Sequence, residues 1–251
     1  MLQGMFTSAT ALGAFQTALN TTSNNLANIN TTAFKRSTVS FEDLVYNGAQ
    51  NFQVGNGVRV GSIAPLGFTQ GTIIPTGRDL DVAISGTGFL TVQLPNGNIR
   101  YTRDGSLSRD SNGRLVTTVG GNILQPPITI PSDTISTSIG SDGTVTVITS
   151  SAPNTPKTLG QIQLTSFINQ EGLEIDGGNL YAESAASGPP TTGTAGTGGL
   201  GTLQQDSLEQ SNVDTTTELT NLVTSQQAYV ANSKVISTSN QMLTSTMQLI
   251  Q

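Results

Sequence analysis

Three carboxylates lie close together in the sequence, and an acid and base pair for glycoside hydrolysis needs residues of this type. They are Glu171, Glu174 and Asp176. The glycines that surround them favour a charged surface loop instead. A peptidoglycan-hydrolysing or cell-wall-binding module therefore stays a remote alternative.

Two other motifs are incomplete. Asp110, Asn112 and Gly113 resemble the opening of a calcium loop, but its remaining ligands and its distal Glu are absent. Gly86 and Gly88 resemble a fragment of a phosphate-binding loop, yet they join two β-rich runs and do not open a helix. Turns explain both motifs better, so we predict no metal, no cofactor and no catalytic residue.

Composition excludes several functional classes. His, Cys and Trp are absent from the 251 residues, which removes the commonest general base, the thiolate nucleophile and almost every transition-metal site. We therefore do not expect an enzyme. The net charge is -6 and the ten Lys and Arg residues form no cluster, so we expect no nucleic-acid binding.

The sequence also predicts no membrane insertion. No stretch is apolar for long enough to span a bilayer. Residues 1–34 lack the basic region and the unbroken apolar region of a cleaved signal peptide. If the protein is exported, another route must carry it.

Both ends of the chain are uncharged, because every ionisable side chain lies between Lys35 and Lys234. An ordinary amphipathic helix presents a charged face to water. Small hydroxyl, amide and apolar side chains instead suit burial against other protein, where an unpaired charge is costly. Disordered low-complexity tails are the alternative.

Apolar residues repeat every seven positions at both ends, as in coiled coils. The N-terminal series is Met5, Leu12, Leu19 and Leu26, with Ser8, Phe15, Thr22 and Ile29 three positions further on. The C-terminal series is Leu222, Tyr229, Ile236, Leu243 and Ile250, preceded directly by Ala228, Val235, Met242 and Leu249. Ser225, Asn232, Ser239 and Thr246 lie between these series. The patterns predict two helices that pair in a coiled-coil-like core. The helices either pack against several neighbouring subunits or form a hairpin within one chain.

Local signals predict where these helices begin and end. Thr215 and Glu218 have the spacing of a capping box, so the C-terminal helix should begin near residue 215. The N-terminal helix should end around Asn28 to Asn30, where a run rich in Asn and Thr precedes the first charges.

The middle of the chain alternates short β-rich runs with turn signals. The predicted strands cover 80–85, 89–94, 99–102, 115–118, 144–149 and 161–167, and the predicted turns cover 95–97, 110–113 and 141–143. Short spacings exclude crossover helices, so the sheet should be antiparallel. The predicted fold is α+β, with an N-terminal helix and assembly segment over 1–45, a β-rich outer domain over 46–204 and a C-terminal assembly helix over 205–251. A segment rich in Gly, Pro and Thr over 185–202 should form a flexible return to that helix.

Residues 23–36, SNNLANINTTAFKR, resemble the N-terminal signature of flagellar rod and hook proteins. Further resemblance covers 79–84, 88–89, 101–105, 113–117, 208–214, 226–229, 232–236 and 242–243, so it spans essentially the whole chain. Ser23 and Ala33 stand where the family usually has Ala and Gly. Both departures are small, although a left-handed backbone is less comfortable at position 33 for Ala than for Gly.

Within this family, the chain length and the stretches 128–131 and 159–181 resemble the distal rod members most. Residues 46–58 form a shorter segment than is usual in distal rods and approach the length seen in hook proteins. A hook or proximal-rod protein of the same family is therefore the alternative.

The resemblance implies a structural subunit that polymerises into a helical tube, transmits torque and passes exported subunits. It also implies a location in the basal-body rod that crosses the periplasm, and export by the flagellar type III apparatus without a cleaved signal. The implied partners are further copies of the chain, other rod proteins, the hook protein and the surrounding outer rings.

We expect the assembly residues to lie in the terminal helices and the adjoining motifs. They are Met5, Leu12, Leu19, Asn24, Asn25, Leu26, Asn28, Phe34, Ser211, Asn212, Val213, Leu222, Tyr229, Val235, Ile236, Met242, Leu243 and Ile250.

Overall fold

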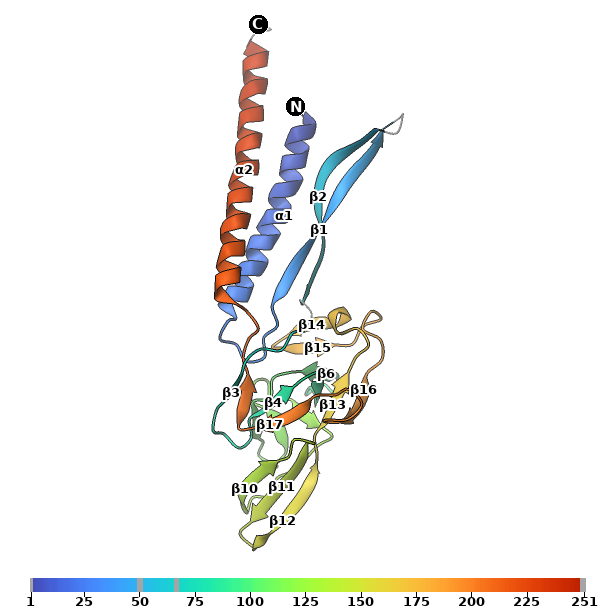
Figure 1. Ribbon diagram of the computed structural model, residues 1–251, viewed down its shortest axis with the longest axis vertical. Coiled ribbons are helices and arrows are strands. Elements are labelled where there is room, and N and C mark those ends of the chain that lie inside the picture. Colours follow the sequence, from blue (N-terminus) through green and yellow to red (C-terminus); the bar gives the residue numbers. More distant parts are fainter. Residues whose placement is uncertain (1, 49–51, 66–67, 249–251) are drawn as a thin grey trace. The chain divides into compact units, whose positions relative to one another are not determined.

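A computed structural model describes residues 2–48, 52–65 and 68–248 (Figure 1). Contacts within the chain divide it into two compact units. We call Met1–Ile29, Arg36–Leu66 and Val213–Gln251 the terminal unit, and Asn30–Lys35 and Gly67–Asn212 the β unit. The boundary expected at residue 46 falls inside a strand of the terminal unit.

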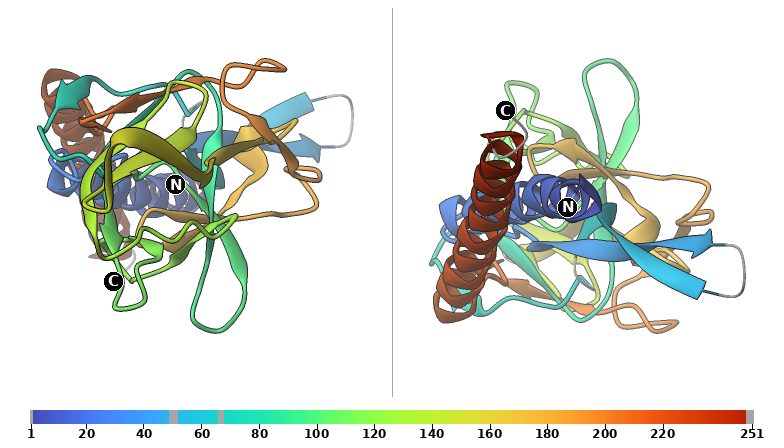
Figure 2. Two further views of the ribbon diagram at one scale, coloured as in Figure 1. Left: turned by 90° about the horizontal axis from the view of Figure 1, so that it is seen from below. Right: turned by 90° about the horizontal axis from the view of Figure 1, so that it is seen from above.

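The terminal unit consists of two long helices and an antiparallel ribbon. Helix α1 covers Leu2–Ala27 and helix α2 covers Thr215–Gln248, while the ribbon strands are β1, Ser37–Gly48, and β2, Phe52–Pro65. Within this unit α1 lies between α2 and the ribbon (Figures 1 and 2). The β1–β2 register shifts between Ser40 and Phe41 and again between Asp43 and Val45. Such bulges increase the twist of a ribbon.

Helix α2 begins at the predicted residue, but a different side chain caps it. The Oδ2 atom of Asp214 accepts the backbone N–H of Thr217 at 2.7 Å, so Asp214 is the N-cap. Hydrogen bonds from Thr217 lower the pKa of the Asp214 carboxyl. The predicted Thr215–Glu218 capping box is therefore wrong, because the Glu218 carboxylate is buried in another hydrogen-bonded group. Helix α1 ends at Ala27, within one residue of the prediction.

Five threonine hydroxyls of α2 donate hydrogen bonds to carbonyls of the helix itself. Thr220 donates to the carbonyl of Thr216 at 2.8 Å, and Thr224 donates to that of Thr220 at 2.8 Å. Thr238, Thr244 and Thr246 repeat this bond to the fourth residue before each. These five hydroxyls are satisfied within the helix, while the surface of α2 stays polar in composition.

The β unit is built from short strands and one 3₁₀ turn, η1, Gln170–Gly172. Its strands are β3, Ile73–Pro75; β4, Val82–Ser85; β5, Phe89–Gln93; β6, Ile99–Thr102; β7, Leu107–Arg109; β8, Leu115–Thr117; β9, Ile123–Gln125; β10, Thr134–Ile139; β11, Thr144–Thr149; β12, Ala152–Gln161; β13, Gln163–Ser166; β14, Glu174–Gly177; β15, Leu180–Ala182; β16, Thr191–Thr194; β17, Thr202–Gln205; and β18, Ser207–Glu209.

The strand pairs of the β unit are antiparallel, as predicted. The largest sheet has the order β14-β15-β6-β5-β9-β8-β7, and β13 joins it through β5 while also pairing with β16. Smaller sheets contain β10-β11-β12, β17-β4 and β18-β3. Each of the six predicted strands matches an observed one, and the α+β fold class is confirmed. The segment 185–202 is not all irregular, because it contains β16.

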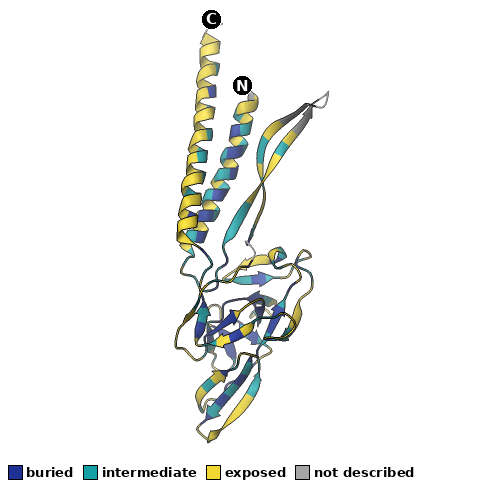
Figure 3. Ribbon diagram, viewed as in Figure 1, coloured by how far each residue is buried: buried dark blue, intermediate teal, exposed yellow. Residues whose placement is uncertain are grey.

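The core of the β unit comes from alternating apolar positions on these strands. Val82, Ile84, Leu90, Leu107 and Leu164 have no solvent exposure. A second cluster holds Phe68, Phe89, Tyr101, Phe167, Leu173 and Tyr181, with edge-to-face ring contacts. Removing one such side chain typically costs about 2–5 kcal/mol. Figure 3 shows the contrast with α2, which is mostly exposed.

Candidate functional site

The carboxylates considered for glycoside hydrolysis lie on the surface. Glu171 is in η1, whereas Glu174 and Asp176 are in β14, and their side chains are exposed. Asp176 accepts a hydrogen bond from Nε of Arg100 at 2.5 Å. A general acid with a raised pKa needs a buried setting, which these positions do not provide.

The calcium-like motif is a turn whose carboxylate is already engaged. Oδ1 of Asp110 accepts the backbone N–H groups of Asn112 and Arg114 at 2.9 and 2.8 Å, and Oδ2 accepts Nε of Arg114 at 2.8 Å. Gly113 donates its N–H to the Asp110 carbonyl at 3.0 Å, which closes the predicted turn. In the residues that the structure describes, no group of three or more His, Cys, Asp or Glu side chains is arranged to hold a metal ion.

The predicted turn at Gly86 and Gly88 is also present. Both residues have a positive φ, 107° and 131°, and they connect β4 to β5. The residues of these three incomplete motifs thus serve the β fold.

One face of α2 turns toward α1. Glu218 and Ser239 are buried, and half-buried residues alternate with them at spacings of three and four. These half-buried residues are Leu222, Ser225, Tyr229, Asn232, Ile236 and Leu243. We call this set of eight residues the α2 seam. It contains four of the predicted assembly residues: Leu222, Tyr229, Ile236 and Leu243.

Helix α1 meets α2 and the ribbon mainly through small side chains. Its buried positions are Ser8, Ala11, Ala14, Ala18, Thr22 and Asn25. The larger predicted residues Met5, Leu12, Leu19 and Leu26 are only half-buried. Small residues at the most buried positions permit close approach of the backbones. The backbone of β2 approaches α1 closely at Gly57, where a Cβ would lie 2.2 Å from Oγ1 of Thr10.

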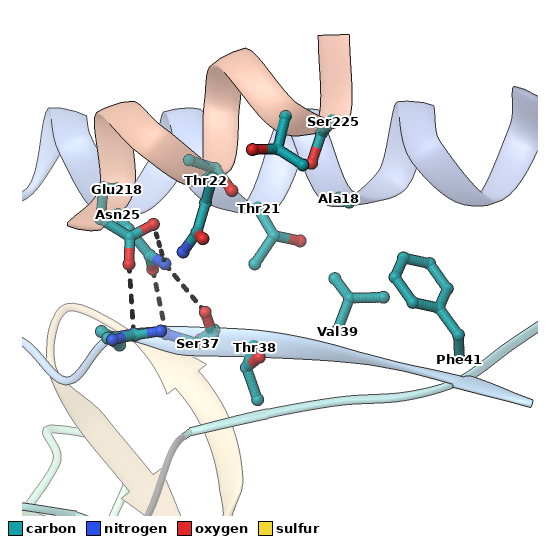
Figure 4. A pocket seen from close by; sticks show the side chains of 13 residues that line it. Ala18, Thr21, Thr22, Asn25, Ser37, Thr38, Val39, Phe41, Glu218 and Ser225 are labelled. Carbon is teal, nitrogen blue, oxygen red and sulfur yellow. Dashed lines mark hydrogen bonds and ion pairs between the residues drawn. The ribbon is translucent and has the colours of Figure 1, made fainter. Parts of the chain in front are cut away.

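A polar group fastens the base of the terminal unit (Figure 4). Nδ2 of Asn25 donates to Oε2 of Glu218 at 3.2 Å and to the Ser37 carbonyl at 2.8 Å. Oδ1 of Asn25 accepts the Ser37 N–H at 2.9 Å, and Nε of Arg36 lies 3.1 Å from Oε1 of Glu218. The asparagine therefore joins α1, α2 and β1.

A pocket of about 240 Å³ opens beside this polar group. Its lining includes the hydroxyls of Thr21, Thr38 and Ser225 and the apolar side chains of Val39 and Phe41. Figure 4 shows these side chains on α1, α2 and β1. The pocket is mixed in polarity and matches no metal or nucleotide chemistry.

Two apolar sets on α2 stay exposed outside the seam. The first, the lower flank, is Leu219, Val223 and Val230, which are 46%, 49% and 60% exposed. The second, the upper flank, is Val235 and Met242, both 47% exposed. At 100° per residue these two flanks lie on opposite sides of the seam. Val235 and Met242 were predicted assembly residues; the lower flank was not identified from the sequence.

The remaining predicted residues lie at the helix ends or between elements. Asn24 is exposed and accepts a hydrogen bond from Asn28, whose Nδ2 lies 2.9 Å from the Asn24 carbonyl. In the β unit, Asn212 donates its N–H to the Phe34 carbonyl at 3.3 Å, and Ser211 is half-buried. Val213, in the terminal unit, is buried. Ile250 lies outside the described residues.

Sequence reasoning missed the charged residues that border the uncharged ends. Arg36 and Glu218 pair in the terminal unit, and Lys35, Arg103 and Glu209 form a buried cluster in the β unit. Their position in the sequence could have identified two of them, because Lys35 and Arg36 are the first charged residues of the chain. Neither α1 nor α2, over the residues described, is long and apolar enough to cross a membrane.

Comparisons with known proteins match nearly the whole chain. Residues 5–35 match the family described as flagella basal body rod protein, 83–147 the flagellar hook protein FlgE/F/G D1 domain, and 204–249 the flagellar basal body rod FlgEFG protein C-terminal region. The flagellar basal-body rod protein FlgG of Buchnera aphidicola subsp. Acyrthosiphon pisum is 44% identical over 99% of this chain and 100% of its own. FlgG of Caulobacter vibrioides is 43% identical over 99% of both chains, and FlgG of Bacillus subtilis is 38% identical over 97% of both.

Proposed function

This chain belongs to the FlgG family of flagellar basal-body rod proteins, and we propose that its terminal helices join each copy to its neighbours in a helical tube. It is a structural subunit of the distal rod and not an enzyme. It assembles with other components of the rod.

The exposed apolar residues of α2 are the observation that carries this proposal. Val223, Val230, Val235 and Met242 remain about half exposed after α1 has packed on the seam. Their helix has no charged residue after Lys234, so it lacks the solvating face of an ordinary surface helix. Surfaces of this kind are typical of protein contacts.

Two flanks on opposite sides of the seam suit a tube better than a closed pair. A head-to-tail contact joins two different surfaces, and its repetition produces a helical polymer. In this arrangement the lower flank of one copy faces a surface of a second copy, while the upper flank faces a third.

The same family membership supports the finer assignments of place and partners. We propose that the tube crosses the periplasm, transmits torque, passes exported subunits, meets the hook protein at its distal end and runs inside the outer rings. We also propose export by the flagellar type III apparatus without cleavage, since the uncharged N-terminal segment has no signal-peptide pattern.

Electron microscopy of basal bodies from a strain that lacks this chain tests the position. We expect loss of both the distal rod and the hook, leaving a short proximal stub. A complete rod without a hook would contradict the distal-rod position and favour a hook-type subunit, consistent with the short 46–58 segment.

Val235→Asp tests the assembly surface. A carboxylate in a subunit contact is costly unless it is paired, so the variant should be exported but should not polymerise. Thr238→Asp is the matched control, because Thr238 is also exposed and a carboxylate there lies four residues from Lys234, where the two charges attract. Normal rods in Val235→Asp, or equal loss in both variants, would contradict the assignment of the upper flank.

A further inference from the structure

Three charged side chains lie together in the interior of the β unit. Nζ of Lys35 is 2.6 Å from Oε1 of Glu209, and Nε of Arg103 is 2.8 Å from Oε2 of the same carboxylate. The side chains of Lys35, Glu209 and Arg103 are 0%, 0% and 1% exposed. We call these three residues the Glu209 cluster.

Backbone groups complete the hydrogen bonding of the cluster. Lys35 donates to the Thr69 carbonyl at 2.8 Å, and Gly71 donates its N–H to Oε1 of Glu209 at 2.8 Å. Arg103 donates to carbonyls of the β4–β5 turn, including those of Gly86 and Gly88, each at 3.0 Å. The carboxylate therefore bridges the first segment of the β unit, the segment after β2, and the core strands.

Burial of these three charges has an unfavourable desolvation free energy, so it is an inefficient way to stabilise a fold. Burial of ions is costly even when they are paired, and here two cations share one carboxylate. Burial lowers the pKa of Lys35, and the attraction of Glu209 opposes that shift. Apolar residues of similar volume often stabilise such a site as well or better. A role in holding specific segments together explains the charges better than stability alone.

The position of the cluster along the chain identifies those segments. The chain passes between the two units at 29/30, 35/36, 66/67 and 212/213. Lys35 is the last residue before one passage, and Thr69 and Glu209 lie within three residues of two others. Ala33 donates its N–H to the Glu209 carbonyl at 2.8 Å, and Gln210 donates to the Thr72 carbonyl at 2.9 Å. The segments that carry the passages are thus bonded to one another inside the β unit.

We infer that Glu209 is a positioning residue that clamps the connecting segments of the β unit to Arg103, so that load from the terminal helices reaches the core through several segments in parallel. Without the clamp, the same load would peel the connecting segments from the β unit one at a time. This inference rests on the proposed function, because only a subunit of a rotating tube bears such load.

Lys35→Met is the sharpest variant. It removes one cation and leaves Arg103 and Glu209 as a neutral pair, so the core should fold. The first segment loses its ion pair with Glu209 but keeps its backbone bonds, so amide exchange at Ala33 should become about tenfold faster, as expected when a local opening loses a charged hydrogen bond. Arg100→Met is the matched control, since it removes the cation of a partly exposed ion pair in the same unit.

Motility under load separates a clamp from a simple stabiliser. We expect Lys35→Met cells to build complete rods and to swim in dilute medium, but to stop in viscous medium where Arg100→Met cells still swim. Unchanged exchange at Ala33, or equal performance of the two variants in viscous medium, would overturn the clamp. Loss of rods in both variants would count against it too, because the defect would not then depend on load. If Lys35→Met does not fold, Lys35→Gln, which keeps a neutral hydrogen-bond donor, replaces it. The same amide-exchange and motility outcomes then support or overturn the clamp. Failure of the proposed function would be seen separately, as intact rods in the strain without this chain.

Discussion

Asn25 and Glu218 are 193 positions apart, yet Nδ2 of Asn25 donates a hydrogen bond to Oε2 of Glu218 at 3.2 Å. The same amide group bonds both backbone groups of Ser37. A single side chain therefore sets how α1, α2 and the start of β1 meet. An amide suits this position because it both donates and accepts hydrogen bonds without adding charge.

Asn25→Asp should break this junction. It removes the donor and places a second carboxylate beside Glu218, which we expect to destabilise the terminal unit by about 3 kcal/mol. Swimming in soft agar and the number of rods in isolated basal bodies measure the effect. Asn20→Asp adds the same charge at an exposed position of α1 outside the predicted assembly residues and should be much milder. Equal phenotypes would show that the junction is not required.

Leu222→Asp and Ile236→Asp should block polymerisation by a different route from Val235→Asp. Both residues belong to the seam, so the new carboxylate disrupts the packing of α2 on α1 before any neighbour binds. The β unit should keep its melting temperature, because its core lies elsewhere in the chain. Circular dichroism of the purified protein distinguishes the routes: helix content should fall in the seam variants and not in Val235→Asp. Normal motility in the seam variants would count against an assembled helical core.

Ala33 is held in a left-handed conformation, with a φ of 55° and only 1% exposure. Ala33→Val should destabilise the β unit by about 2 kcal/mol, because a branched side chain strongly disfavours this region. In Ala33→Gly, relief of about 1 kcal/mol should nearly offset the lost methyl burial of about 0.8 kcal/mol. Urea denaturation followed by tyrosine fluorescence provides the measurement. A Val variant as stable as the Gly variant would mean that the strain is absent.

Asp104 should make the stability of the β unit depend on pH. Burial raises the pKa of its carboxyl above 3.8, and the nearby Asp81 carboxylate adds to this effect, while hydrogen bonds with Ser106 oppose it. A raised pKa stabilises the fold fully below pH 3.8, and that stability is lost as the pH rises through the folded-state pKa. Asp104→Asn should therefore increase the free energy of unfolding more at about pH 7 than at about pH 3.5. A gain that is equal at both pH values would refute the assignment.

Much of the architecture follows from local sequence signals. Seven-residue repeats predicted both long helices and the seam of α2, because a helix that packs on one neighbour buries every third and fourth residue. Alternating β-branched residues and glycine turns predicted β4, β5, β6, β8, β11 and β13. These features depend on neighbours within about a turn, so one sequence is enough to reveal them.

Other features depend on distant parts of the chain, and the sequence did not reveal them. The β1–β2 ribbon was not predicted as a hairpin, because bulges interrupt its alternation. The cap at Asp214 was assigned to the next residue, since both side chains fit the pattern. The Glu209 cluster joins residues 106 and 174 positions apart, and no local pattern indicates such a pairing. The sequence also did not separate the α2 seam from the two flanks, because that separation depends on which face of α2 is covered by α1.

The charge-free helix ends also determine how the assembled tube should respond to its surroundings. Residues 1–34 and 235–251 carry no ionisable side chain, so contacts made by these stretches have no Coulomb attraction for dissolved ions to screen. A tube held together through them should keep its strength when the ionic strength of its medium rises or falls. Its integrity would then depend on shape and buried apolar area, which the bacterium does not need to regulate as the external salt concentration changes.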